Sequence, residues 1–276
     1  MRAYVPGYEL RTIRSLSEAL ELMADEPSGW RPFAGGTDIM VLFAAGGLKH
    51  RRFVNLWGMK ELRTIHVDTT SITLGALTTY SDILRHATLR SKFPLLSAAA
   101  EATGSVAIQN RGTVGGNIMN GSPAADMPPA FLVYDAEVEL TSVRGTRWIP
   151  YGSFHTGYKQ MRCQPDELLT AVRLPRKTGR WRFNFTKVGP RNAQAISKVC
   201  FAGLHNKEQN EVRIAFGSVA PVPLRCFQTE TAIREGGDAL AVLAAEVSPI
   251  TDLRSTAEYR RRVAQNLLRE FLYGEN

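Results

Sequence analysis

A glycine-rich run from Arg111 to Asp126 constrains this chain more than any other stretch. It reads RGTVGGNIMNGSPAAD, and prolines and a short apolar segment follow it. Glycine lets backbone N–H groups approach an anion closely because no Cβ intervenes, and it can adopt the left-handed conformations that point successive N–H groups inward. The run is therefore typical either of a phosphate-binding turn or of a buried loop whose glycines permit close packing.

A second glycine turn, AGGTD, lies far upstream at residues 34–38. It follows a short extended run at 30–33 and precedes an apolar segment at 39–45, which a glycine pair ends. This order predicts a strand, a turn and a helix, with Thr37 as the helix N-cap. Because the first N–H groups of a helix are free and its dipole is positive at that end, this turn is a second segment suited to an anion.

The composition excludes several classes of protein. The 276 residues are 44% hydrophobic, which is enough for two or three domains with real cores. The formal charge is +8, but the basic residues are scattered, which argues against nucleic acid and favours a solvated basic face or docking onto an acidic partner subunit. No window is long and apolar enough for a membrane span and no signal peptide is recognisable, so we expect a cytoplasmic protein.

Residues for self-contained catalysis are not grouped in the sequence. The cysteines Cys163, Cys200 and Cys226 form no CxxC pair, so neither a disulfide framework nor a protein-held metal cluster is expected. The chain contains no GxSxG, HExxH or GxxxxGK motif, and its five histidines are isolated from one another. It also lacks the GxGxxG turn of the usual dinucleotide fold.

The two glycine turns together favour a dinucleotide whose pyrophosphate lies between them. Thr113, Asn117 and Asp126 offer a hydroxyl, an amide and a carboxylate to ribityl or ribose hydroxyls. For Asp126 the other interpretation is a plain N-cap of a helix over 127–134. Arg111 has two interpretations as well, since it can face the phosphates or a partner subunit.

The order of elements along the rest of the chain indicates an α+β protein. Ser15 and Glu18 have the spacing of a capping box before a first helix, and Ser255 and Glu258 have it before the last. Hairpins are predicted over 64–74 and 137–150, and a helix over 95–103. Beyond the polar run at 175–179, strands followed by helices predict a separate tail domain.

At these motifs the chain resembles the FAD-binding (medium) subunits of molybdenum hydroxylases, the family that includes xanthine dehydrogenase and carbon monoxide dehydrogenase. The resemblance covers essentially the full length. It rests on AGGTDI at 34–39, IQNRGTVGGNIMNGSPAAD at 108–126, DELL at 166–169 and IAFGSVAPVPLRC at 214–226. NGSPAAD, APVPLRC and GSFHTGY at 152–158 are especially similar to the bacterial xanthine dehydrogenase FAD subunit.

The resemblance implies an FAD-binding fold of the vanillyl-alcohol-oxidase/PCMH type. Two FAD-binding subdomains are expected at 1–57 and 58–176, with FAD between them, and a C-terminal α+β domain at 177–276. The positions that match or adjoin the family's flavin contacts are Arg31, Ala34, Gly35, Gly36, Thr37, Asp38, Ile39, Thr113, Gly115, Gly116, Asn117, Asp126, Leu169 and Lys187.

The implied function is electron relay. A molybdopterin-binding large subunit would hydroxylate the substrate, an iron-sulfur small subunit would pass the electrons on, and FAD held here would deliver them to NAD or another acceptor. The stretch 189–195, GPRNAQA, contains no acid where animal-type xanthine dehydrogenases have a charged, partly acidic loop. The alternatives are a self-contained flavin oxidoreductase of the vanillyl-alcohol-oxidase superfamily and an assembly module that has lost its cofactor.

Overall fold

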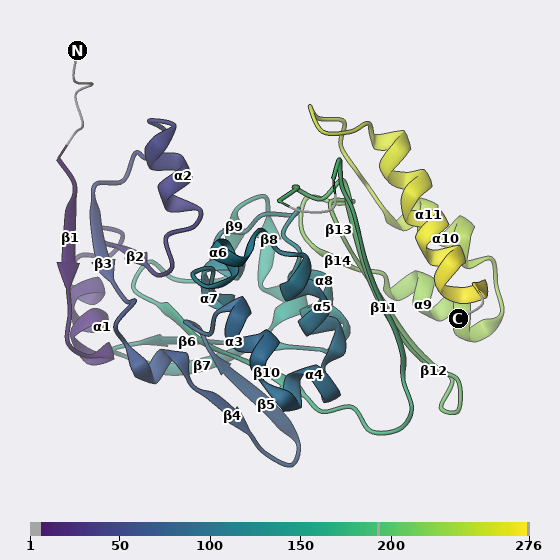
Figure 1. Ribbon diagram of the computed structural model, residues 1–276, viewed down its shortest axis with the longest axis horizontal. Helices are drawn as coiled ribbons and strands as arrows, with labels where there is room; N and C mark the ends of the chain where they lie inside the picture. Colours follow the sequence, from purple (N-terminus) through teal and green to yellow (C-terminus); the bar gives the residue numbers. More distant parts are fainter. Residues whose placement is uncertain (1–6, 192–193, 275–276) are drawn as a thin grey trace.

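The computed structural model describes residues 7–191 and 194–274, and its strands within these ranges form three larger sheets that follow one another along the chain, together with one two-stranded hairpin (Figure 1). The first is parallel, in the order β1 (Glu9–Thr12), β3 (Arg52–Asn55), β2 (Arg31–Phe33). The second is antiparallel, in the order β4 (Ile65–Val67), β5 (Ser71–Gly75), β10 (Leu168–Pro175), β6 (Glu137–Ser142), β7 (Gly145–Pro150). The third is antiparallel, in the order β11 (Arg182–Val188), β12 (Val199–Asn206), β13 (Glu211–Gly217), β14 (Leu224–Arg225). A separate small hairpin pairs β8 (His155–Gly157) with β9 (Gln160–Met161).

The helices separate the sheets and cover the last of them. In Figure 1, α9, α10 and α11 lie on the outer side of the third sheet, whereas α5 and α8 lie between the second and third sheets. The helices are α1 (Leu16–Asp25), α2 (Ile39–Ala44), α3 (Tyr80–Arg85), α4 (Ala87–Lys92), α5 (Pro94–Ala102), α6 (Val106–Gln109), α7 (Val114–Met119), α8 (Pro128–Val133), α9 (Phe227–Glu235), α10 (Ala239–Glu246) and α11 (Ala257–Tyr273), with 3-10 turns at Lys60–Arg63 and Tyr151–Ser153.

The two central strands of the third sheet, β12 and β13, are apolar on both faces. In β12, Phe201 packs in the core under α9 to α11, and its neighbour Ala202 packs in the core shared with the second sheet. In β13, Phe216 likewise packs in the core under α9 to α11, and Ala215 packs in the core shared with the second sheet. Because successive side chains of a strand point to opposite faces, a sheet covered on both sides requires such continuous apolar runs.

Several predicted helix starts and hairpins are confirmed. The Ser15 hydroxyl accepts a hydrogen bond from the N–H of Glu18 at 3.2 Å, and Pro94 stands in the first turn of α5. The hairpin predicted over 64–74 is formed by β4 and β5, and that over 137–150 by β6 and β7. Local patterns sufficed here because turn residues and alternation act over short distances.

Other local predictions were wrong at the level of single residues. Thr37 does not cap α2, because the N-cap is Asp38 and its side chain makes no capping hydrogen bond. The last helix is capped by Thr256, whose hydroxyl accepts from the N–H of Tyr259 at 3.2 Å, rather than by Ser255. Ser255 instead pairs with Asp252 in a tight local loop, so this turn takes Ser255 and the cap moves to the next residue.

Over the part of the chain that the structure describes, three further features bear on function. No helix there combines the length and the apolar character needed to cross a membrane. No group of three or more histidine, cysteine or acidic side chains is arranged to hold a metal ion. The cysteines Cys163, Cys200 and Cys226 are free thiols.

Candidate functional site

The turn between β2 and α2 leaves backbone donors open. Gly36 has a left-handed φ of +78°, and its carbonyl accepts from the N–H of Met40 at 2.9 Å. The N–H groups of residues 35–38 have no acceptor among the described residues. Successive open N–H groups next to a left-handed glycine make a concavity that suits an anion. This turn therefore has open backbone donors of the kind that an anion requires.

The run at residues 113–117 behaves differently, because the protein itself uses its backbone donors. Thr113 is the N-cap of α7, and its hydroxyl accepts from the N–H of Gly116 at 3.1 Å. Its carbonyl accepts from the N–H of Asn117 at 2.9 Å, and the N–H of Gly115 donates to the Ala76 carbonyl at 2.8 Å. Val114 similarly donates to Thr78. Among the N–H groups of residues 113–117, only that of Thr113 has no acceptor among the described residues, so this segment offers a phosphate fewer open donors than the 35–38 turn does.

Gly115 serves close packing instead. A Cβ at this position would stand 2.8 Å from the Cβ of Ala76, and the residue is buried. Gly116, one residue on, is exposed, and a Cβ there would meet only the Thr113 hydroxyl, at 2.8 Å. Each glycine thus fits one interpretation of the motif. Gly115 permits close packing, whereas Gly116 leaves a surface of α7 uncovered.

The two glycine segments, distant in sequence, meet along a seam. A Cβ on Gly35 would fall 1.7 Å from the carbonyl oxygen of Arg111, so only glycine allows this approach. Asn120 donates from Nδ2 to Oδ1 of Asp38 at 3.2 Å, and Arg111 donates from Nε to the carbonyl of Gly35 at 3.3 Å. The open N–H groups of the first turn therefore lie beside α7.

An unpartnered polar atom lies on α7. The Oδ1 of Asn117 is buried and has no hydrogen-bond partner among the described residues. The phenol of Tyr80 lies beside the Asn117 side chain; burial raises the Tyr80 pKa, and the amide lowers it in part. A buried carbonyl oxygen without a donor is costly, and a ligand N–H or hydroxyl would satisfy it.

Asp126 forms a buried ion pair with Lys187 of β11. Lys187 donates from Nζ to Oδ2 of Asp126 at 2.6 Å and to the carbonyl of Ala102 at 2.9 Å, while Ser197 donates to Oδ1 at 2.6 Å. The helix-cap interpretation of Asp126 was wrong, since the N-cap of α8 is Met127 and makes no side-chain bond. Burial raises the pKa of Asp126, and Lys187 and Ser197 oppose that shift.

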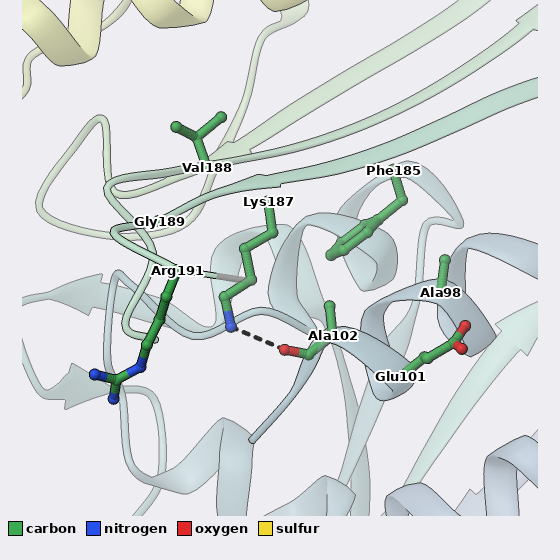
Figure 2. Close-up of a pocket in the computed structure, with 8 residues that line it drawn as sticks. All are labelled: Ala98, Glu101, Ala102, Phe185, Lys187, Val188, Gly189 and Arg191. Carbon is green, nitrogen blue, oxygen red and sulfur yellow. Dashed lines mark hydrogen bonds between the residues drawn. The ribbon is translucent and has the colours of Figure 1, made fainter. Parts of the chain in front are cut away.

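A cavity of about 580 Å³ opens beside this pair. Figure 2 shows the Lys187 side chain reaching from β11 toward the Ala102 carbonyl, between Arg191 on one side and Glu101 on the other. The lining comes from the end of α5, from β11 and from the segment that follows β11: Ala98, Glu101, Ala102, Phe185, Lys187, Val188, Gly189 and Arg191. The lining is mixed, because it contains two cations, Lys187 and Arg191, one acid, Glu101, and otherwise apolar residues. Of the acid-free stretch 189–195, residues 192 and 193 lie outside the described residues.

Two predicted residues lie apart from these contacts. Arg31 is exposed on β2, and Leu169 is buried in β10 within the central core and does not line the cavity. The structure adds residues that sequence reasoning missed: Tyr80 beside Asn117, Ser197 on Asp126, and Trp57, whose ring lies 3.7 Å from the Arg111 guanidinium. No local pattern marks Ser197 as the partner of Asp126, because the two are 71 residues apart.

Comparison with known proteins identifies the family to which the chain belongs. The family model described as the FAD-binding domain in molybdopterin dehydrogenase matches residues 7–177, and that of the CO dehydrogenase flavoprotein C-terminal domain matches residues 184–274. The xanthine dehydrogenase FAD-binding subunit of Escherichia coli O157:H7 is 30% identical over 270 residues, covering 94% of this chain and 92% of that protein. The glyceraldehyde dehydrogenase medium chain of Sulfolobus acidocaldarius is 29% identical over 273 residues, covering 96% of each.

Among solved structures, carbon monoxide dehydrogenase from Hydrogenophaga pseudoflava, in a form that lacks the Mo-pyranopterin moiety, matches with a TM-score of 0.91. It is 24% identical and covers 97% of this chain and 96% of that chain, a likeness that establishes the fold. The fold is thus an α+β FAD-binding domain followed by a C-terminal domain. The chain belongs to the FAD-binding subunits of the molybdenum hydroxylases, and it is an oxidoreductase subunit with FAD as its cofactor.

The residues present suit that cofactor. The open N–H groups of 35–38 match the charge of a pyrophosphate, and the unpartnered Oδ1 of Asn117 lies on the helix beside them. Gly116 leaves the surface of α7 clear at the same place.

Proposed function

We propose that this chain holds FAD across the seam between the 35–38 turn and α7. We propose further that it passes electrons from an iron-sulfur subunit to NAD or another acceptor. The observation that carries the proposal is the meeting of open backbone donors at 35–38 with the buried, unpartnered Oδ1 of Asn117. The open N–H groups can donate to a pyrophosphate, and the Asn117 Oδ1 can accept from a hydroxyl or imide N–H elsewhere on the same molecule.

We assign the cofactor contacts by position along this seam. The turn 35–38 would bind the pyrophosphate, Asn117 and Thr113 the ribityl or ribose hydroxyls, and Lys187 with Asp126 would stand next to the ring. The full proposed set is Arg31, Ala34, Gly35, Gly36, Thr37, Asp38, Ile39, Thr113, Gly116, Asn117, Asp126, Leu169 and Lys187, with Gly115 supporting them through its packing on Ala76.

When bound, FAD supplies the electron-accepting and electron-donating chemistry. The chain's own contribution at the cavity is electrostatic. Asp126 and the Ala102 carbonyl hold the ammonium group of Lys187 in place, so its positive charge is fixed rather than mobile. Because Asp126 balances that charge, the pair acts as a fixed dipole, and its ammonium end would favour negative charge on a group that lies directly against Lys187.

The relatives support a role within a larger assembly. They are named as subunits or medium chains of dehydrogenases, so we infer that this chain also works with a molybdopterin-binding large subunit and an iron-sulfur small subunit. The formal charge of +8 suits docking onto an acidic partner. We also propose the division into subdomains 1–57 and 58–176 and a C-terminal domain 177–276; limited proteolysis should then cut first near residues 177–181.

The test is a rapid-mixing experiment on the purified complex under anaerobic conditions. With a substrate of the large subunit present, we expect the iron-sulfur absorbance to bleach before the flavin bands, and added NAD to restore the flavin bands. A reduced complex that reoxidises with a quinone or dye but not with NAD would contradict the NAD assignment only. Oxidation of a substrate by the isolated chain would instead support a self-contained oxidoreductase, and an isolated chain that binds no FAD would contradict the proposal altogether.

A further inference from the structure

Arg111 is held on two sides at the seam. Its guanidinium lies 3.7 Å from the ring centroid of Trp57, and its Nε donates to the carbonyl of Gly35 at 3.3 Å. Arg63 lies on the same ring at 4.4 Å, so the indole has two arginine neighbours. A guanidinium stacked on an indole is attracted by the negative face of the ring. Arg111 is thus fixed by the protein itself.

The hydrogen bond to Gly35 has a geometric consequence for the neighbouring donor. The Gly35 carbonyl and the Gly36 N–H belong to one peptide unit, and in a trans peptide these two groups point in opposite directions. The structure contains no cis peptide bond among its described residues. Because the carbonyl of Gly35 points toward Arg111, the N–H of Gly36 points away from Arg111. The hydrogen bond from Arg111 thereby fixes the direction of one of the open N–H groups of residues 35–38.

We propose that Arg111 is a positioning residue for the diphosphate-binding turn. Stacked on Trp57, it holds the Gly35 peptide so that the Gly36 N–H faces the diphosphate of FAD, and it need not contact the phosphates itself. This inference rests on the proposed FAD site. It accounts for a glycine pair in which Gly35 allows the approach of Arg111 and Gly36 supplies the left-handed turn. The donor of the hydrogen bond is charged, so the interaction is of the stronger kind.

The test compares FAD with riboflavin, which lacks the phosphates, on the full chain stripped of flavin. Arg111→Met keeps the length of the side chain but removes the donor, and Trp57→Leu removes the stacking surface. We expect each to weaken FAD binding roughly 10- to 100-fold, the range that loss of a charged hydrogen bond gives. The double variant should bind no more weakly than the weaker of the two single variants, because both act through one contact. Riboflavin affinity should stay within about twofold, since positioning of the turn concerns only the diphosphate.

Controls separate this role from the alternatives. Arg63→Met removes the other arginine on Trp57 and should leave FAD affinity within about twofold. Trp57→Phe keeps an aromatic face and should restore most of the affinity lost in Trp57→Leu, which also covers the case in which the leucine variant folds poorly. Loss of FAD binding in Arg111→Met with none in Trp57→Leu would overturn the proposal in favour of direct phosphate contact. Equal losses for FAD and riboflavin would show a merely structural role. No FAD binding by the unaltered chain would instead overturn the proposed function, and this inference with it.

Discussion

Lys187 and Asp126 form a 2.6 Å ion pair whose two side chains are only 11% and 10% exposed. The pair joins β11 to the loop before α8, and it lies next to the cavity. A buried charge without its partner is costly, so each half of such a pair depends on the other. This dependence makes the pair measurable through its effect on stability.

The first prediction concerns Lys187→Met. Burial already raises the pKa of Asp126, and Lys187 is the largest opposing cause, so its removal should raise that pKa further. A carboxyl whose folded pKa exceeds its unfolded value contributes stability below the unfolded pKa and loses it as pH rises through the folded pKa. The variant should therefore lose roughly 3 kcal/mol near neutral pH and less near pH 4. Urea unfolding across that range measures it.

The double variant Lys187→Met with Asp126→Asn is the control, because it removes both charges. Its free energy of unfolding should lie above that of Lys187→Met at neutral pH and should lack the additional pH slope. A loss in Lys187→Met that is the same at every pH would show that packing, rather than the unpaired carboxylate, causes it.

The second prediction concerns Gly116→Leu. Gly116 is exposed on α7, and a side chain there would cover the surface beside Asn117 and press on the Thr113 hydroxyl. We expect FAD affinity to fall at least about tenfold, while the far-ultraviolet spectrum stays that of the unaltered chain, because the fold does not need this surface. Gly7→Leu, at an exposed glycine with no atom within 4 Å of an added Cβ, is the matched control. Full FAD occupancy in Gly116→Leu would show that this surface of α7 is not part of the FAD site.

The third prediction concerns Gly35→Ala. The added Cβ would fall 1.7 Å from the Arg111 carbonyl oxygen, so the two glycine segments must move apart. We expect a loss of roughly 2 kcal/mol in unfolding free energy together with loss of bound FAD, since overpacking against backbone cannot relax cheaply. Gly47→Ala is the comparison, because its Cβ would meet the nearest atom at 3.7 Å. Thermal unfolding with and without FAD measures both effects. Equal losses of stability and of FAD binding in the two variants would contradict the close contact between Gly35 and Arg111.

The fourth prediction concerns Asp135, which follows α8 in a left-handed conformation at φ 52°. Its carboxylate contacts Lys177, Arg213 and Arg225, and so ties α8 to the third sheet. Burial alone would raise the pKa of Asp135, but these cations together lower it. A lowered folded pKa contributes stability above the unfolded pKa that is lost as pH falls through the folded value.

Asp135→Asn should therefore flatten the acid side of the stability profile. Asparagine tolerates the left-handed conformation, so the change isolates the charge. Because the side chain is 42% exposed and solvent screens it, we expect a loss of only about 1 kcal/mol at neutral pH, which should shrink as pH falls through the lowered folded pKa. Urea midpoints at several pH values check this. A loss that persists at low pH would show a packing effect instead.

Much of the fold was predictable from local patterns. The Ser15 cap, the position of Pro94 and the two hairpins depend on residues a few positions apart, and the structure confirms them. Thr37 and Ser255 failed as caps because the choice among adjacent polar residues depends on what each can contact in three dimensions. The apolar residues on both faces of β12 and β13 are likewise explained only by the structure, because helices cover one face of the sheet and the second sheet's core covers the other.

The sequence by itself predicted that two glycine segments with polar companions carry the site, because only glycine permits such close backbone approach. The tertiary structure alone decided their roles. The same kind of motif leaves its N–H groups open at residues 35–38 but has them paired at 114–117, since Ala76, Thr78 and Thr113 supply acceptors there. Asp126 proved to be the partner of Lys187 rather than a helix cap. A hydrogen-bonding group takes the partner that folding brings to it, and that partner is often distant in sequence.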